Sequence, residues 1–540
     1  MDRFLPLCRP APKRRNALTP ILDADDATQS KPVRAIARAE WLARAILIGY
    51  VLVFVLYGAV GYTSMGYDDE FFNIRLLEQH GLGAVSLMQK QDVHPPGQYF
   101  INWVLHSLTG DWSMVRLATA LLTALALVYA TESIRQRCGD RAGGMLFVLL
   151  CLNPAILMWC TGLRWYAYFV PVLVWLSITP VRNDWRYWAK CFGGLVLLGY
   201  IGYAVFVVAL PVLLLYWTGA RQGLRTKLTS IFCGALIAAL LYAYQFHIFV
   251  TVHLRAKDGQ VSSMAKNVMG FLIAQMSNQG MFPVSVPAAL SALGVTGMVW
   301  LAFCADSRRN LDNRYLVPYG VGSIISIVLG IAGKFRNLVI MSPWQAMWLA
   351  TLRVSGRHTK AFVLCFAALA AGNLYGTFNV VTHQNTTKNS WDLQLAPVMG
   401  ELARERSACG GDLVVVTHDP ALSWHVDQAG YPQLGPFSSQ TLSRYILGPH
   451  RCVAVVRSYA GNFNASSIEQ MYRQADGLRH GGQTRKQFGR DDNYRMKQRL
   501  DARYPQYQFD ITMYRGVSGL AELTAWHPLA VAGVRNADGD

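Results

Sequence analysis

Charged residues are scarce in this chain. Only 15% of its 540 residues are Asp, Glu, Lys or Arg, whereas charged residues make up about a quarter of an ordinary soluble domain. Acidic residues are rarer than basic ones: the chain has 32 Asp and Glu against 50 Lys and Arg, which gives a formal net charge of +18. Hydrophobic residues account for 52% and aromatic residues for 12%. This composition argues against a soluble globular protein and predicts a protein of the lipid bilayer.

Several familiar sequence signals are also missing. No two of the 10 cysteines have the C-x-x-C spacing of a metal site, and no disulfide framework is indicated. A disulfide between Cys409 and Cys452 is permitted, but the sequence does not decide it. No Gly-rich loop lies at a strand–helix junction, so a nucleotide-binding site is not predicted. The absence of an internal repeat weakens the case for a transporter built from inverted repeats.

The basic residues lie in short runs between apolar stretches. Examples are residues 182–190, 221–227 and 305–314. A nucleic-acid-binding protein would instead gather its cations on a polar domain. Short basic runs of this kind are typical of the cytoplasmic loops of a multi-pass membrane protein. We therefore expect a bilayer around the chain and no nucleic acid as a partner.

The positions of the basic runs predict the membrane topology. Residues 1–44 are polar and basic and no cleavage site follows them, which predicts a cytoplasmic tail and an uncleaved first helix. With every strongly basic loop on the cytoplasmic side, the apolar stretches give about eleven spans. They lie near residues 45–65, 114–134, 143–160, 165–179, 189–203, 204–216, 228–249, 284–304, 315–332, 338–352 and 361–381. Residues 189–216 could also form one kinked helix, but the charge pattern favours two.

The last part of the chain differs in composition from the rest. Residues 382–540 are polar and contain two short β-type runs, 412–418 and 452–458, among turn residues and helical stretches. The predicted fold class is thus a polytopic α-helical membrane domain, residues 45–381, followed by an extracytoplasmic α/β domain. The outer loops 66–113 and 250–283 are the longest, and long loops often carry binding and chemistry. Because the tail is short and basic and no retention signal ends the chain, we expect a bacterial inner membrane and a periplasmic C-terminal domain.

Three consecutive carboxylates follow the first predicted span: Asp68, Asp69 and Glu70. Neighbouring carboxylates repel one another, so a proton or a cation is favoured there, as in a general base or a metal site. Hard oxygen ligands suit Mg²⁺ or Mn²⁺, and Asp68 and Glu70 are the candidate ligands. The alternative is a solvated acidic cap at the start of a helix, where negative charge is also favourable.

His94 precedes two prolines, Pro95 and Pro96. Proline fixes its own backbone and restricts the residue before it, so His94 would be presented in one direction. The simpler interpretation, which the motif alone favours, is a helix start with proline in its first turn.

Four cations lie at the predicted outer ends of spans: Arg116, Arg164, Lys334 and Arg336. Any one of them could merely extend to the membrane surface. If they converge, they would form a phosphate site, since Arg binds phosphate through two parallel contacts and Lys as a point charge. Nearby, the aromatic stretch 159–169 is either a wall for an isoprenoid chain or an interface belt, and we favour the belt for most of its side chains.

Together these motifs resemble the C-type glycosyltransferase (GT-C) superfamily. An acidic pair follows the first span, His-Pro-Pro comes about two dozen residues later, and an Arg opens the next span. The most similar groups look like the protein O-mannosyltransferases and the aminoarabinose transferases that modify lipid A. The resemblance covers Tyr67 to Tyr168 by motif and the rest of the chain by its span layout.

The resemblance implies an enzyme of the cell envelope. Such enzymes move a sugar from a polyprenyl-phosphate donor to an acceptor hydroxyl on a glycan, lipid or protein at the outer membrane face, usually with inversion. Asp69 and Glu70 match the family's Asp-Glu pair, which would make Asp69 the base, but Asp68 is an extra carboxylate and leaves two candidates. Arg116 and Arg164 match family arginines that would bind the donor phosphate, and His94 and Tyr166 would position donor or acceptor.

Two other functions fit the same composition. A transporter or flippase of a lipid-linked sugar would place ionisable residues at mid-bilayer, whereas the prominent ones here lie at span ends. A non-catalytic scaffold would act through its outer domain, and substitution of Asp68, Asp69 and Glu70 would then be silent. The scarcity of mid-span charges favours the enzyme, and a polyprenyl phosphate is already activated, so no nucleotide is required.

Overall fold

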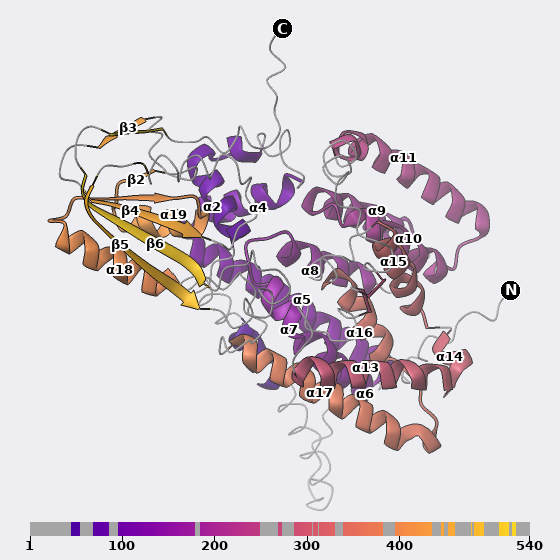
Figure 1. Ribbon diagram of the computed structural model, residues 1–540. Helices are drawn as coiled ribbons and strands as arrows, with labels where there is room; N and C mark the ends of the chain where they lie inside the picture. Colours follow the sequence, from indigo (N-terminus) through magenta and orange to yellow (C-terminus); the bar gives the residue numbers. More distant parts are fainter. Residues whose placement is uncertain are drawn as a thin grey trace, which may run out of the picture. The chain divides into compact units, whose positions relative to one another are not determined.

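The computed structural model is mostly helical, with a β-sheet near its C-terminus (Figure 1). The structure describes residues 45–54, 68–85, 95–178, 184–248, 268–269, 271–272, 286–304, 306–311, 313–329, 339–381, 395–434, 444–447, 452–458, 477, 480–490, 507–517 and 521–524. Most of the predicted loop 250–283 lies outside these residues. The chain divides into two compact units, the first made of Met1–Gly58 and Val115–Asn385, the second of Ala59–Met114 and Thr386–Asp540. This division groups Ala59–Met114 with the C-terminal part, whereas the predicted boundaries assign these residues to the membrane domain.

The first unit is built from helices, and apolar residues dominate them. The described helices are Ala45–Phe54, α5 (Trp112–Cys138, which begins in the second unit), α6 (Asp140–Leu146), the π-helix η1 (Phe147–Cys151), α7 (Pro154–Trp159), α8 (Tyr166–Ser177), α9 (Trp185–Ile201), α10 (Val205–Gly219), α11 (Leu224–Ile248), α13 (Val286–Cys304), α14 (Ser307–Leu311), α15 (Leu316–Val328), α16 (Ser342–Ala350), the 3-10 helix η6 (Gly356–His358) and α17 (Thr359–Val381). Among the described residues, 3 helices are long and apolar enough to cross a membrane: Trp112–Cys138, Val286–Cys304 and Gly356–Phe378. Four shorter apolar helices accompany them.

The predicted span at residues 143–160 is not one helix. It is broken after η1, and α7 begins anew at Pro154, with Asn153 as its N-cap accepting hydrogen bonds from the backbone of the next turn. The cause is the Asn-Pro pair, because proline disfavours helical backbone in the residue before it and is suited to the first position of a helix. Asn373 and Thr377 of α17 donate hydrogen bonds to the carbonyls of Val148 and Leu152, which satisfies backbone groups near the break.

Helices α13 and α17 lie side by side (Figure 1). Their backbones approach closely because the contact is lined by small residues. A Cβ atom at Gly294 of α13 would lie only 2.6 Å from the backbone of Cys365 in α17. Within this contact Ser291 donates a hydrogen bond to Asn373, at 3.4 Å. Residues 189–216 form two helices, α9 and α10, as the charge pattern predicts, and the extended backbone of Gly202 ends the first.

The second unit is an α/β fold joined by two helices from the first predicted outer loop. Its helices are α2 (Asp68–His80), α4 (Gly97–Thr109), α18 (Leu395–Ala408) and α19 (Pro420–Gln428), and its strands are β1 (Leu413–Thr417), β2 (Gln433–Leu434), β3 (Arg444–Leu447), β4 (Cys452–Ser458), β5 (His480–Arg490), β6 (Tyr507–Val517) and β7 (Ala521–Thr524). The main sheet has the order β2-β1-β4-β6-β5. Strand β1 pairs in parallel with β2 and β4, whereas β6 is antiparallel to β4 and β5. The two predicted β runs are therefore neighbouring strands, and β3 and β7 form a separate antiparallel pair.

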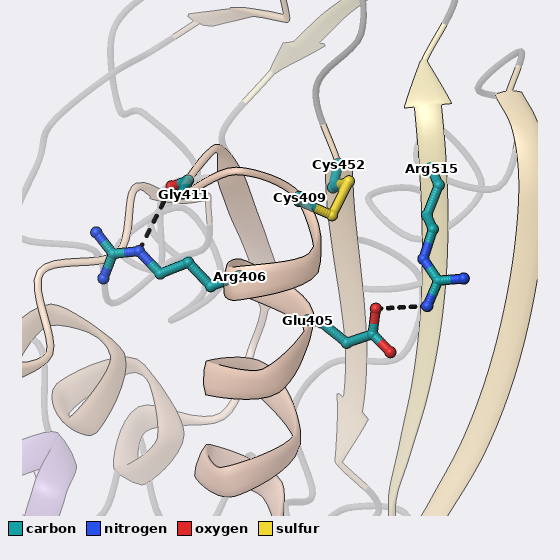
Figure 2. Close-up of a disulfide and its surroundings, with 6 residues drawn as sticks. All are labelled: Glu405, Arg406, Cys409, Gly411, Cys452 and Arg515. Atoms are coloured by element: carbon teal, nitrogen blue, oxygen red, sulfur yellow. Dashed lines mark hydrogen bonds and ion pairs between the residues drawn. A yellow bond between two sulfur atoms is a disulfide. The ribbon is translucent and has the colours of Figure 1, made fainter.

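The core of this fold is centred on β1 and β4. All five residues of β1 are buried, and so are Val453 to Val456 of β4. Helix α18 is fastened to the sheet by charge, since Glu401 binds Lys486 of β5 and Glu405 binds Arg515 of β6, each at 2.6 Å. Figure 2 shows Glu405 reaching Arg515 and, next to α18, the disulfide between Cys409 and Cys452 at the start of β4. This disulfide settles the pairing that the sequence left open.

Candidate functional site

The predicted carboxylates lie at the start of α2. Asp68 and Asp69 are its first two residues, and their side chains lie outside what the structure describes, whereas Glu70 is buried. Negative charge at a helix N-terminus is favourable, so these residues suit the beginning of α2. Of the other predicted residues, His94, Lys334 and Arg336 lie outside the described residues, although the two prolines after His94 do precede α4 directly, as the motif predicts.

Two of the predicted phosphate-binding residues, Arg116 and Arg164, are buried in the first unit, with 6% and 7% of their surface exposed. Arg116 lies on the same face of α5 as Thr123, two helical turns earlier. The Thr123 hydroxyl contacts the carbonyls of Cys160 and Ala167, at 3.0 and 3.2 Å, so this face of α5 packs on the segment that contains Arg164. Burial of a guanidinium is unfavourable unless anions or hydrogen bonds compensate it. Two buried arginines on neighbouring segments are therefore candidates for an anion-binding site.

The aromatic residues next to Arg164 form a buried cluster. Tyr166 begins α8 and is 2% exposed, and its ring centroid lies 3.9 Å from that of Trp165 and 6.0 Å from that of Trp159. Trp165 in turn contacts Phe169 edge to face, at 5.3 Å. The prediction that most side chains of this stretch form an interface belt is wrong, because these rings are buried in the protein instead of facing its surface.

Helix α2 is held by α19 of the same unit. The ring of Phe71 lies 5.6 Å from Trp424 and 5.7 Å from His425, centroid to centroid. One turn later, Arg75 forms an ion pair with Asp427 and donates a hydrogen bond to the carbonyl of Ser423, at 3.3 Å. Arg75 is 3% exposed, so the contact is a buried one. The helix that begins with the predicted carboxylates is thus fixed to the C-terminal α/β fold.

Glu78 extends this contact to the start of α5. Its carboxylate accepts hydrogen bonds from the indole of Trp112, at 3.0 Å, and from that of Trp424, at 3.3 Å, and it also pairs with Arg75. The Trp112 ring stacks on His106 of α4, with the centroids 4.0 Å apart. The three helices α2, α4 and α19 therefore share one network of rings and charges at this end of α2.

Burial shifts the pKa of three groups in or near this network. Burial lowers the pKa of Arg75, and the neighbouring Glu78 carboxylate opposes that shift. The pKa of His425 is lowered by burial as well, so its imidazole is favoured in the neutral form against Phe71. His418, which follows β1 and precedes the N-cap of α19, has its pKa lowered to about 4 for the same reason.

Comparison with known proteins reveals a structural likeness. No family model and no curated protein sequence matches the chain. Its structure is similar to the crystal structure of ArnT from Cupriavidus metallidurans in the apo state, with a TM-score of 0.51 and 11% sequence identity over 88% of this chain and 98% of that chain. The crystal structure of the same ArnT bound to undecaprenyl phosphate gives a TM-score of 0.51 and 12% identity over 87% of this chain and 98% of that chain.

The chain has the ArnT fold. The fold that the motifs predict through their resemblance is thereby confirmed. The likeness includes parts of both units, since it covers 88% of this chain.

The sequence did not point to several residues around α2 of this ArnT-like fold. Arg75, Glu78, Trp424 and Asp427 hold α2, but their partners lie far apart in the chain, 348 residues in the case of Arg75 and Ser423. The sequence carries only a local signal for them. Helical spacing relates Phe71, Ile74 and Arg75 and predicts one buried face of α2, but it does not identify the element that packs on this face. Among the described residues, no group of three or more His, Cys, Asp or Glu is placed to hold a metal ion. The candidate ligand Glu70 is described, but the side chain of Asp68 is not, so Mg²⁺ or Mn²⁺ stays a prediction.

Proposed function

We propose that this protein is a glycosyltransferase that moves a sugar from a polyprenyl-phosphate donor to an acceptor hydroxyl at the extracytoplasmic face of a bacterial inner membrane. The observation that carries the proposal is the ArnT fold, seen in a relative that was crystallised with undecaprenyl phosphate. The acceptor is a glycan, a lipid or a protein of the cell envelope.

The chemistry needs one base and one anion-binding site. Asp69, or its neighbour Asp68, takes the proton from the acceptor hydroxyl while that oxygen attacks the anomeric carbon of the sugar. The bond between this carbon and the phosphate oxygen breaks from the opposite side, which inverts the configuration. Polyprenyl phosphate leaves, and the charge that develops on it is stabilised by Arg116 and Arg164, with Lys334 and Arg336 as further donors. His94 and Tyr166 position the donor and acceptor.

The buried arginines support this assignment. Arg116 and Arg164 come from neighbouring segments, and both lie in a region of low exposure, where a positive charge interacts more strongly with a phosphate than it does in water. The buried rings of Trp159, Trp165 and Tyr166 make the same part of the first unit apolar. An apolar environment of this kind suits the polyprenyl chain of the donor.

The membrane arrangement belongs to the same proposal. About eleven spans with the basic loops inside place residues 1–44 in the cytoplasm and residues 382–540 in the periplasm. The disulfide between Cys409 and Cys452 supports this orientation, because disulfides persist in the periplasm and are rare in the cytosol.

The deciding experiment measures transfer from a panel of radiolabelled polyprenyl-phosphate sugars, in membranes that contain the wild type or the double variant Asp68→Asn, Asp69→Asn. An envelope extract supplies the acceptor. Transfer from one donor that disappears in the double variant would support the enzyme and identify the sugar. If the folded wild type transfers from no donor, the proposal is wrong, and flux of the carrier lipid across the membrane becomes the assay for the transporter alternative.

A second variant tests the phosphate site. Arg116→Ala should weaken binding of undecaprenyl phosphate by about tenfold to a hundredfold, since a charge-assisted hydrogen bond contributes about 1.5–3 kcal/mol. Arg137→Ala, at the opposite end of α5, is the matched control and should leave this affinity unchanged. Equal affinity in all three proteins would refute the role of Arg116. Transfer in EDTA, followed by addition of Mg²⁺ or Mn²⁺, tests the candidate metal on Asp68 and Glu70.

A further inference from the structure

Gln98, at the second position of α4, is buried and has no exposed surface. Within the part of the chain that the structure describes, neither Nε2 nor Oε1 of its carboxamide has a hydrogen-bond partner. Buried polar groups are almost always hydrogen-bonded, and one that is left open destabilises the fold. Folding alone therefore does not explain a glutamine at this position.

The two open atoms define the kind of ligand that would complete them. Nε2 can only donate hydrogen bonds and Oε1 can only accept them. A phosphate oxygen would satisfy Nε2 and leave Oε1 open, and an ammonium group would do the reverse. A pair of neighbouring hydroxyls satisfies both atoms, because each hydroxyl donates one hydrogen bond and also accepts.

The position of Gln98 is fixed by its neighbours in the chain and in α4. Pro95 and Pro96 come directly before α4 and fix the backbone that presents this residue. Tyr99 and Asn102, the next buried residues of the helix, are fully buried as well, and Asn102 lies one turn after Gln98 on the same face. Tyr99 and Asn102 both have interactions in the structure. Nε2 and Oε1 of Gln98, by contrast, have no hydrogen-bond partner among the described residues.

We propose that Gln98 binds the sugar of the donor, with its carboxamide Nε2 donating to one ring hydroxyl and Oε1 accepting from the adjacent one. This inference rests on the proposed function and adds to it a group that distinguishes one sugar from another. A site built to hydrogen-bond a hydroxyl discriminates strongly against an analogue that lacks it, because the buried polar group is then left open.

Gln98→Leu separates this role from a structural one. Leucine has a similar volume and no polar atoms, so it removes an unsatisfied group from the interior. The thermal midpoint of the ligand-free variant should equal or exceed that of the wild type, while kcat/KM for transfer falls about tenfold to a hundredfold. An unchanged kcat/KM, as expected if the carboxamide only binds a trapped water, would overturn the proposal, and so would a lowered midpoint.

A binding measurement keeps the inference independent of transfer. The shift in thermal midpoint is compared for undecaprenyl phosphate alone and for undecaprenyl-phosphate sugars, in the wild type and in Gln98→Leu. The sugar should add a shift in the wild type that Gln98→Leu loses, and Gln136→Leu, an exposed glutamine of α5, should keep it. A sugar-dependent shift without transfer from any donor would refute the proposed function and retain the role of Gln98. No added shift from any sugar, or the same added shift in Gln98→Leu, would refute the role of Gln98.

Deoxy-sugar donors identify the hydroxyls. Removing the hydroxyl that contacts Gln98 should lower kcat/KM of the wild type by about tenfold. It should leave kcat/KM of Gln98→Leu unchanged, because that variant has already lost the interaction. Equal losses in both proteins at every ring position would contradict a direct contact.

Discussion

Helices α2 and α18 both pack in the second unit, but they are held in different ways. The carboxylates of α18 bind Lys486 and Arg515 on the strands, and a disulfide follows directly at Cys409. Helix α2 comes from a distant part of the chain and is held by one buried arginine, Arg75, together with the ring contacts of Phe71. The difference indicates that α18 is part of the α/β fold itself, whereas α2 is a segment from elsewhere in the chain that the fold holds in place.

The largest effect on stability should come from the disulfide that follows α18. Cys409→Ser opens a loop of 43 residues, and the loss of its closure should lower the free energy of unfolding by about 4 kcal/mol. Hydrogen exchange should rise in α18 and β4 before it rises in α2. Thermal unfolding of the full chain with and without a reductant checks the magnitude, and an unchanged midpoint would show that the disulfide contributes nothing.

Arg75→Gln should have the next largest effect on stability, and it also tests whether the position of α2 matters for transfer. It leaves the carboxylate of Asp427, which is only 12% exposed, without its ion-pair partner, and this should destabilise the fold by about 3 kcal/mol. Because Asp69, the proposed base, lies on the same helix, transfer should also fall, by about tenfold or more, through a small displacement of its carboxylate.

The matched control for this variant is Arg515→Gln, which breaks the ion pair of α18 with Glu405. The Arg515 side chain is 45% exposed, and Glu405 keeps Lys486 nearby at 3.9 Å, so the expected loss of stability is only about 1 kcal/mol. Transfer should stay at the wild-type rate. Equal losses of transfer in the two variants would abolish the distinction between α2 and α18.

Acid should weaken the fold that holds α2. Burial lowers the pKa of His418 to about 4, below the ordinary value of about 6.5, so below pH 6.5 the unfolded chain binds a proton that the folded one does not. The contribution of His418 to the free energy of unfolding is fully present above pH 6.5. It declines as the pH falls toward 4, and about 2 kcal/mol of it is lost at pH 5. His418→Gln should flatten this part of the pH profile of thermal unfolding. A profile identical to that of the wild type would show that His418 is not its source.

Much of the fold could be predicted from local patterns. The strands β1 and β4 are short apolar runs and were predicted, as was the division of residues 189–216 into two helices. Strand β5 was missed because it contains three glycines and several cations and is largely exposed at the edge of the sheet. The break at Asn153 and Pro154 had a local signal, which the prediction of a span at residues 143–160 overlooked.

The candidate site was predictable only in part. The order of Asp69, His94 and Arg116 pointed to a superfamily whose fold the chain has. The contact between Arg75 and Asp427 was not predictable, since no local pattern identifies the partner of an ion pair that joins distant segments. The open carboxamide of Gln98 also needed the structure, because only burial distinguishes it from an ordinary polar residue of α4.

The most direct test of the account compares Asp69→Asn, Asp68→Asn and Asp111→Asn for both transfer rate and donor affinity. Asp111 is an exposed carboxylate before α5 that accepts a hydrogen bond from the Ser113 backbone, a role that asparagine keeps. Asp69→Asn should lower the transfer rate by about 10²–10⁴-fold and leave donor affinity within about twofold, because a base acts on the acceptor proton. Asp111→Asn should match the wild type, and a loss confined to Asp68→Asn would make Asp68 the base. Full transfer in both Asp68→Asn and Asp69→Asn would contradict the claim that α2 carries the catalytic carboxylate.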